Sequence, residues 1–170
     1  MAAGSTYTPI ATTTLGSAQS SYTFSSISAS YTDLRLIMNI KTSDAGAVSD
    51  LKITVNGDTS SGFYSSTRMY GSGSAVASDR SSSQNSWNQN GVNCTDSTAF
   101  GNMLCDFQNY SNSTTYKTML MRSNPAGNYT MAVVCLWRNT NAITSITLTP
   151  ASGGNINSGS TLTLYGIAAA

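Results

Sequence analysis

The sequence predicts an all-β protein: an antiparallel, jelly-roll-like β-sandwich of about 8–10 strands with little or no helix. Three observations support this prediction. Ser, Thr, Asn and Gly, which favour helices poorly, make up almost half of the 170 residues, and Glu is absent. Apolar residues recur at every second position in short runs, as in half-buried strands. Gly, Asn, Ser and Pro separate these runs at short intervals, as in antiparallel proteins with many tight turns.

Each expected strand is a run with a period of two. In the clearest run, residues 33–42, four apolar side chains share one face: Leu34, Leu36, Met38 and Ile40. Residues 51–55 alternate in the same way and end in Asn56-Gly57, which tolerate the positive φ angles of a tight turn, so we expect a hairpin into residues 62–70. The remaining strands are expected at 7–15, 21–27, 99–107, 116–122, 129–138, 143–148 and 161–167.

Residues 71–97 break this rhythm, because Trp87 is almost their only large apolar residue. We therefore expect one domain, 1–170, with an N-terminal arm at 1–6 and a long polar loop at about 71–97. Long loops in compact domains are usually either functional or mobile, and Trp87 is costly to leave in water.

Composition removes several classes of function. The chain has eight Lys and Arg residues and seven acidic residues, for a net charge of +1. A protein with so small a net charge has no strong electrostatic attraction for nucleic acid or for an acidic membrane surface. The chain has no His, which removes His-based acid–base catalysis and His-ligated metal sites. A hydrolase that uses two Asp carboxylates remains formally open, but turn and cap roles explain these residues better. We expect no enzymatic activity, no cofactor and no metal.

No segment predicts export or membrane insertion. Residues 1–6 lack the basic start and the apolar stretch of a secretory signal. The longest apolar run, Met131 to Trp137, is far shorter than the roughly 20 residues of a spanning helix. Cys94, Cys105 and Cys135 allow at most one intrachain bridge, and we expect them to be reduced in a cytosol.

Aromatic side chains among neutral polar groups keep a carbohydrate site open. The candidates are Tyr64, Tyr70, Trp87 and Tyr110. Core filling and cross-strand pairing are the alternatives, since tyrosine does both routinely in sheets.

Seven segments resemble small β-rich virion structural proteins of tailed bacteriophages, notably those of cyanobacteria and other aquatic hosts. The segments are 7–15 (YTPIATTTL), 24–27 (FSSI), 31–34 (YTDL), 56–58 (NGD), 68–73 (RMYGSG), 137–146 (WRNTNAITSI) and 162–167 (LTLYGI). The resemblance covers nearly the whole chain except much of 71–97. It implies either a capsid decoration (cement) protein or the head domain of a tail fibre.

The sequence favours decoration, because it has no heptad or collagen-like repeat that could build a fibre shaft. On this hypothesis the protein is made in the host cytoplasm, resides on the capsid exterior, binds the major capsid protein and forms a homotrimer, with no nucleic-acid or membrane partner. The alternative is a tail-fibre head domain that recognises a host surface glycan. The candidate interface comprises Tyr64, Arg68, Tyr70, Trp87, Tyr110 and Tyr165.

Overall fold

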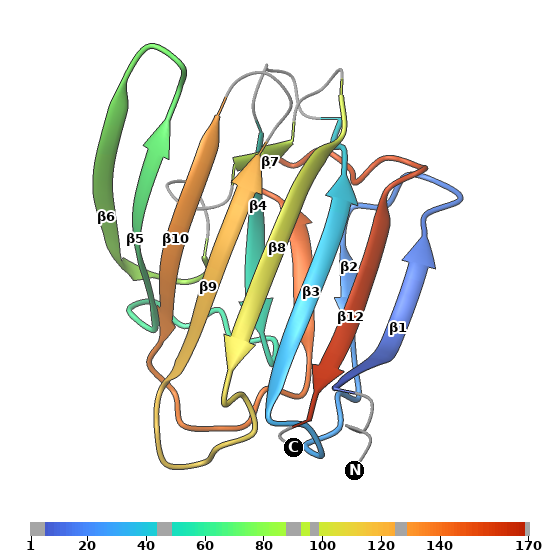
Figure 1. Cartoon of the computed structure of the whole chain (residues 1–170), viewed down its shortest axis with the longest axis vertical. Helices are drawn as coiled ribbons and strands as arrows, with labels where there is room; N and C mark the ends of the chain where they lie inside the picture. Colours follow the sequence, from blue (N-terminus) through green and yellow to red (C-terminus); the bar gives the residue numbers. More distant parts are fainter. Residues whose placement is uncertain (1–5, 44–48, 88–92, 96–98, 125–128, 169–170) are drawn as a thin grey trace.

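The computed structural model describes residues 6–43, 49–87, 93–95, 99–124 and 129–168, and it contains no helix in these ranges. The described residues form twelve strands (Figure 1). They are β1 (Tyr7–Thr14), β2 (Tyr22–Phe24), β3 (Asp33–Ile40), β4 (Ser49–Val55), β5 (Tyr64–Gly71), β6 (Val76–Gln84), β7 (Asn93–Thr95), β8 (Gly101–Gln108), β9 (Lys117–Asn124), β10 (Thr130–Trp137), β11 (Ile146–Pro150) and β12 (Thr161–Ile167).

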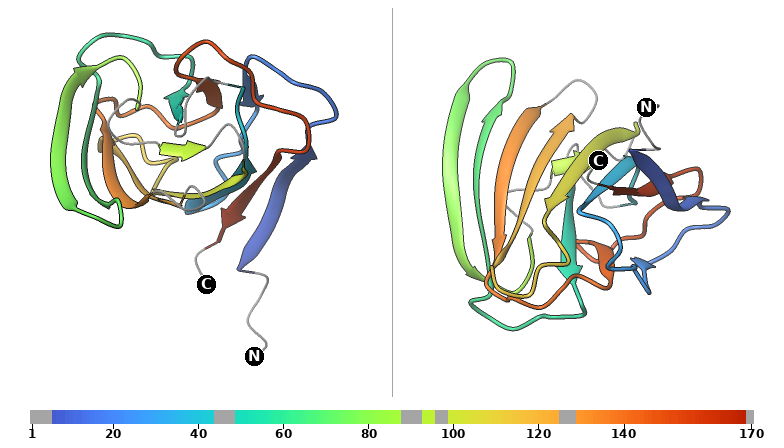
Figure 2. Two further views of the ribbon diagram at one scale, coloured as in Figure 1. Left: turned by 90° about the horizontal axis from the view of Figure 1, so that it is seen from above. Right: turned by 60° about the horizontal axis from the view of Figure 1, so that its bottom comes forward.

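The strands form two sheets that pack as a sandwich. The large sheet has eight strands in the order β1-β12-β3-β8-β9-β10-β5-β6, and the small sheet has four in the order β2-β11-β4-β7. Every pairing between neighbouring strands is antiparallel. Figure 2 shows the large sheet curling at its β5–β6 end, with the small sheet on its inner side. The predicted antiparallel, all-β sandwich is confirmed.

The core lies between the two sheets and follows from the period-two pattern. All four apolar side chains predicted for one face of β3 are buried, and they pack in one cluster with small-sheet residues such as Ile53 and Leu148. The outward face of the large sheet is left without a covering layer among the described residues (Figure 2).

The expectation of a long polar loop at 71–97 is wrong for most of its described part. β6 occupies Val76–Gln84 and pairs along its length with β5, and β7 adds a short edge strand to the small sheet. These two strands account for the difference between the ten expected strands and the twelve observed. β6 escaped prediction because its residues are mostly exposed at the sheet edge, so they carry no alternating apolar signal.

The turn at Asn56-Gly57 forms as expected, but the hairpin does not. Both residues have positive φ angles, 54° and 66°, and the Asp58 N–H donates to the Val55 carbonyl at 2.9 Å. β4 then pairs with β11 and β7, whereas β5 lies in the large sheet. The turn therefore carries the chain from one sheet to the other, because β11, distant in sequence, occupies the place beside β4.

The expected N-terminal arm, residues 1–6, lies outside the described residues except for Thr6, whose carbonyl accepts a hydrogen bond from the Ala168 N–H. The start of β1 and the end of β12 lie side by side, because Tyr7 pairs with Ile167 (Figure 1). A search of the described residues finds no helix of the length and hydropathy needed to cross a bilayer.

Candidate functional site

Three of the six candidate interface residues belong to the core. Tyr64, Trp87 and Tyr110 are all at most 1% exposed. The Trp87 indole N–H donates to the Leu136 carbonyl at 3.1 Å, and the Tyr110 hydroxyl donates to the Ser28 carbonyl. For these three residues the prediction of a surface role is therefore wrong, and the alternative of core filling is correct.

The other three candidates are partly exposed but lie at opposite ends of the large sheet. On β5, the Arg68 guanidinium binds the Asp79 carboxylate at 2.8 Å and lies 4.8 Å from the centre of the Tyr70 ring. Tyr165 lies on β12, where its ring meets the Tyr7 ring edge-on at 6.2 Å. The structure thus brings Arg68 and Tyr70 together, but it does not join them to Tyr165 in one site.

The outer face of the large sheet carries a surface that the candidate list missed. On β9 and β10 every second residue is buried, yet the residues between them are not uniformly polar. Several apolar side chains of five neighbouring strands point outward and are exposed or half-buried. Six of them are Ile37, Met69, Leu104, Leu120, Ala132 and Val134, which we call the outer apolar patch. Met69 is 63% exposed and Val134 56%.

The strand register sets most of this patch in one row across the sheet. Ile37 pairs with Leu104, Leu104 with Arg122, Arg122 with Ala132, and Ala132 with Met69. Side chains opposite each other in an antiparallel pair point to the same face, so these five are neighbours. Arg122 is therefore the centre of a row that is otherwise apolar.

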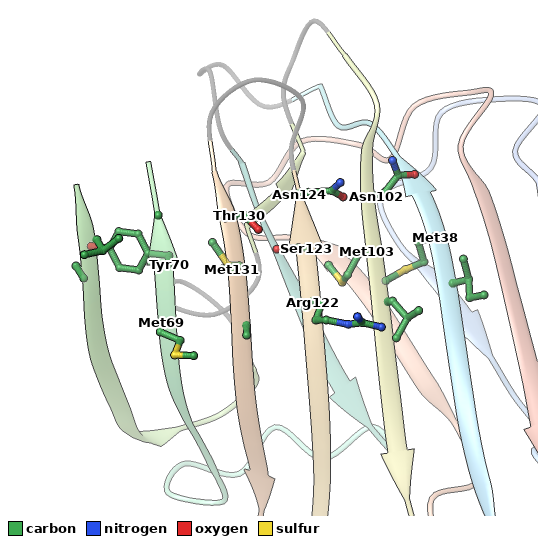
Figure 3. Close-up of a pocket in the computed structure, with 16 residues that line it drawn as sticks. Met38, Met69, Tyr70, Asn102, Met103, Arg122, Ser123, Asn124, Thr130 and Met131 are labelled. Carbon is green, nitrogen blue, oxygen red and sulfur yellow. The ribbon is translucent and has the colours of Figure 1, made fainter. Parts of the chain in front are cut away.

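A groove of about 710 Å³ follows this row (Figure 3). Three exposed residues form the polar side of the groove, Asn102, Asn124 and Thr130. Each lies on the same strand as a member of the row and two residues closer to an end of that strand. Buried residues such as Met103 and Met131 also line it; because their side chains point inward, their backbone is what faces the groove. Arg122 is the one charged residue among the described residues that line the groove.

The charges on this face are unevenly satisfied. Arg35 and Asp106 form a two-bond ion pair, in which Nη2 lies 3.0 Å from Oδ2, and this hydrogen bonding raises the pKa of Arg35. Arg35 also donates to the Tyr7 hydroxyl at 2.9 Å. By contrast, no ion pair or hydrogen bond joins the side chain of Arg122 or of Arg80 to any residue that the structure describes. Both are exposed, so the face carries two uncompensated positive charges.

The site offers apolar area, neutral amides and a cation, which are groups for binding rather than for proton transfer. Within the described ranges, no three residues among His, Cys, Asp and Glu lie close enough together to hold a metal ion.

One feature of the sequence does indicate the outer apolar patch. Met131 to Trp137 is an unbroken apolar run within a strand, and such a run means that both faces of the strand are apolar.

The chain matches no family model and no curated protein. Solved structures with some likeness include a human SPRY domain, at 10% identity and a TM-score of 0.38, covering 95% of this chain and 97% of that chain. The alginate lyase Aly36B, solved as a mutant with an alginate tetrasaccharide, has 10% identity and a TM-score of 0.35, covering 94% and 80%. Likenesses this distant support no inference about activity.

Proposed function

We propose that this chain is a non-enzymatic virion structural protein of a tailed bacteriophage. In this proposal it decorates the outside of the capsid and docks through the outer face of its eight-stranded sheet. The resemblance of seven segments to phage virion proteins supports the class. The observation that carries the docking role is the outer apolar patch, because contiguous apolar surface rimmed by polar groups marks interaction sites.

The mechanism is mechanical. A decoration protein adheres to neighbouring capsid subunits, and pulling those subunits apart re-exposes the apolar surface that the contact had buried. Each square ångström of apolar surface contributes about 25 cal/mol, and a protein contact of standard size buries about 1,600 Å² in total. Because the protein binds the assembled shell and not its separated subunits, occupancy stabilises the shell by mass action.

Copy number in purified virions, measured by quantitative mass spectrometry, tests the proposal. Hundreds of copies per particle support decoration. About a dozen copies would instead indicate a tail appendage, and complete absence from the particle would overturn the virion assignment. The expected homotrimer is tested separately by sedimentation equilibrium of the purified protein.

Recognition of a host glycan by a tail-fibre head domain is the less favoured function. That alternative depended on exposed aromatic rings, and Tyr64, Trp87 and Tyr110 are in the core. Tyr70 is the one aromatic residue among the described residues that line the groove, and it pairs with the inward-facing Met131, so its ring packs against the core rather than in the groove.

A further inference from the structure

The groove on the outer face contains a chemical contrast that selects among partners. Arg122 is exposed, has no partner among the described residues, and is flanked in its row by Leu104 and Ala132, both half-buried. A guanidinium presents a fork of donors that matches a carboxylate, and apolar neighbours that exclude water strengthen such a pair.

We infer that this groove binds an extended segment of a protein partner in which a carboxylate side chain lies between apolar side chains. The carboxylate pairs with Arg122, and the apolar side chains of the segment pack on Ile37 and Leu104 on one side and on Ala132 and Met69 on the other. This inference rests on the proposed function, in which the shell protein supplies the segment.

The dimensions of the row fit such a segment. Five adjacent strands at about 4.8 Å spacing give the row a length of about 19 Å, which an extended chain covers with about six residues. The amides of Asn102 and Asn124 and the hydroxyl of Thr130 border the groove, where they can hydrogen-bond the backbone of the segment.

Charge complementarity argues against pairing of this face with the same face of a second copy of the chain. The outer face offers Arg122 and Arg80 as unpaired charges, whereas the Asp106 carboxylate on the same face is held by Arg35. The Asp33 carboxylate, at the end of β3, accepts the Asn109 N–H at 2.6 Å. Two such faces brought together would oppose unpaired cations without a free acid between them.

A sugar chain fits the groove less well than a peptide does. Sugars pack on aromatic faces, but the exposed apolar members of the row are Ile37 and Met69, which are aliphatic. Methionine side chains adapt to irregular apolar partners, as protein contact surfaces require.

The test uses purified shells that lack this protein and measures the affinity of the added full-length chain. Arg122→Glu is expected to weaken binding about 10- to 100-fold, the cost of losing a charge-assisted contact. Arg80→Glu is the matched control, because it makes the same charge change at an exposed, unpaired arginine of the same face that does not line the groove. It is expected to change affinity less than threefold. Equal affinities for wild type and Arg122→Glu, or equal losses in the two variants, would overturn the inference.

A photo-crosslinking residue at Leu104 identifies the occupant. Recovery of a capsid-protein peptide that contains Asp or Glu supports the inference, and reversal of that acid to Lys should restore binding of Arg122→Glu. Capture of a second copy of this chain or of a glycan would overturn it. Failure of the wild-type chain to bind shells at all would instead refute the proposed function, so the two failures are distinguishable. Thermal unfolding of each variant confirms that the exposed substitution leaves the fold intact.

Discussion

Replacement of Trp87 by Ala separates a core role from a surface role for this residue. The side chain is 1% exposed, meets the Tyr64 ring edge-on at 5.3 Å and lies 6.2 Å from the Phe107 ring. Its backbone pairs with Ile53 through two hydrogen bonds of 3.0 Å, and its indole N–H reaches the Leu136 carbonyl. The substitution removes the ring contacts and the indole donor together.

A buried Trp→Ala change costs about 3–5 kcal/mol, through lost transfer energy and the cavity left behind. For a domain of this size, each kcal/mol lowers the melting temperature by about 2–4 °C, so we expect a fall of about 6–20 °C. Trp87→Phe keeps ring packing but leaves the Leu136 carbonyl without its donor, at a cost of about 1–3 kcal/mol.

The assay is urea unfolding followed by the fluorescence of Trp137, the remaining tryptophan, with calorimetry for the melting temperature. A Trp87→Ala protein within about 0.5 kcal/mol of wild type would show that the residue is not in the core, because only surface substitutions are that mild.

Three further predictions follow from packing and burial. A Cβ added at Gly166 would overlap the Tyr31 ring, so Gly166→Ala should destabilise the protein by about 1–3 kcal/mol, measured by urea unfolding. Combining it with Tyr31→Ala, which removes the ring, should abolish most of that cost. Burial opposes ionisation of Asp58, but hydrogen bonds from the Ser60 N–H and the Trp137 indole outweigh it and lower the pKa of Asp58 below 3.8. The Asp58 carboxylate therefore stabilises the fold above pH 3.8, and this stabilisation is lost as the pH falls through the lowered pKa of Asp58. Asp58→Asn should accordingly reduce the loss of unfolding free energy at acidic pH, measured by urea unfolding across a pH series. An unchanged acidic part of that curve would contradict this. Burial raises the pKa of the Cys135 thiol, so an alkylating reagent should label it at neutral pH only after unfolding; rapid labelling of Cys135 in the native protein, located by peptide mass spectrometry, would contradict its position.

The inward side of the large sheet could be predicted from the sequence because a strand has a period of two. Apolar and other residues alternate over residues 33–40, and this alternation determines which side chains face the core. In β3 every apolar side chain predicted to be buried is buried. The position of Trp87 could not be predicted. Its contacts with Ile53 and Leu136 join residues 34 and 49 positions away, and no local pattern encodes such pairings.

The candidate site eluded sequence reasoning for a related reason. Arg122 stands between Leu104 and Ala132 only because β9 lies between β8 and β10 in a particular register. A shift of one residue in either pairing would send Arg122 to the opposite face from its neighbours. The sequence alone shows an arginine in a strand, whereas the groove exists only after six strands are assembled.

The two edges of the large sheet differ from its outer face in how they resist association. β1 carries Pro9, which cannot donate a ladder hydrogen bond, and its pairing with β12 shifts register between Pro9 and Ala11. β6 carries Asp79 and Arg80, and Ser83 has a positive φ of 57° where its pairing with β5 shifts. Charges, prolines and bulges are the features that prevent strands from adding to a sheet edge. The outer apolar patch has no such protection beyond its single central cation, so association of this sandwich is expected through the face of the large sheet rather than by extension of its edges.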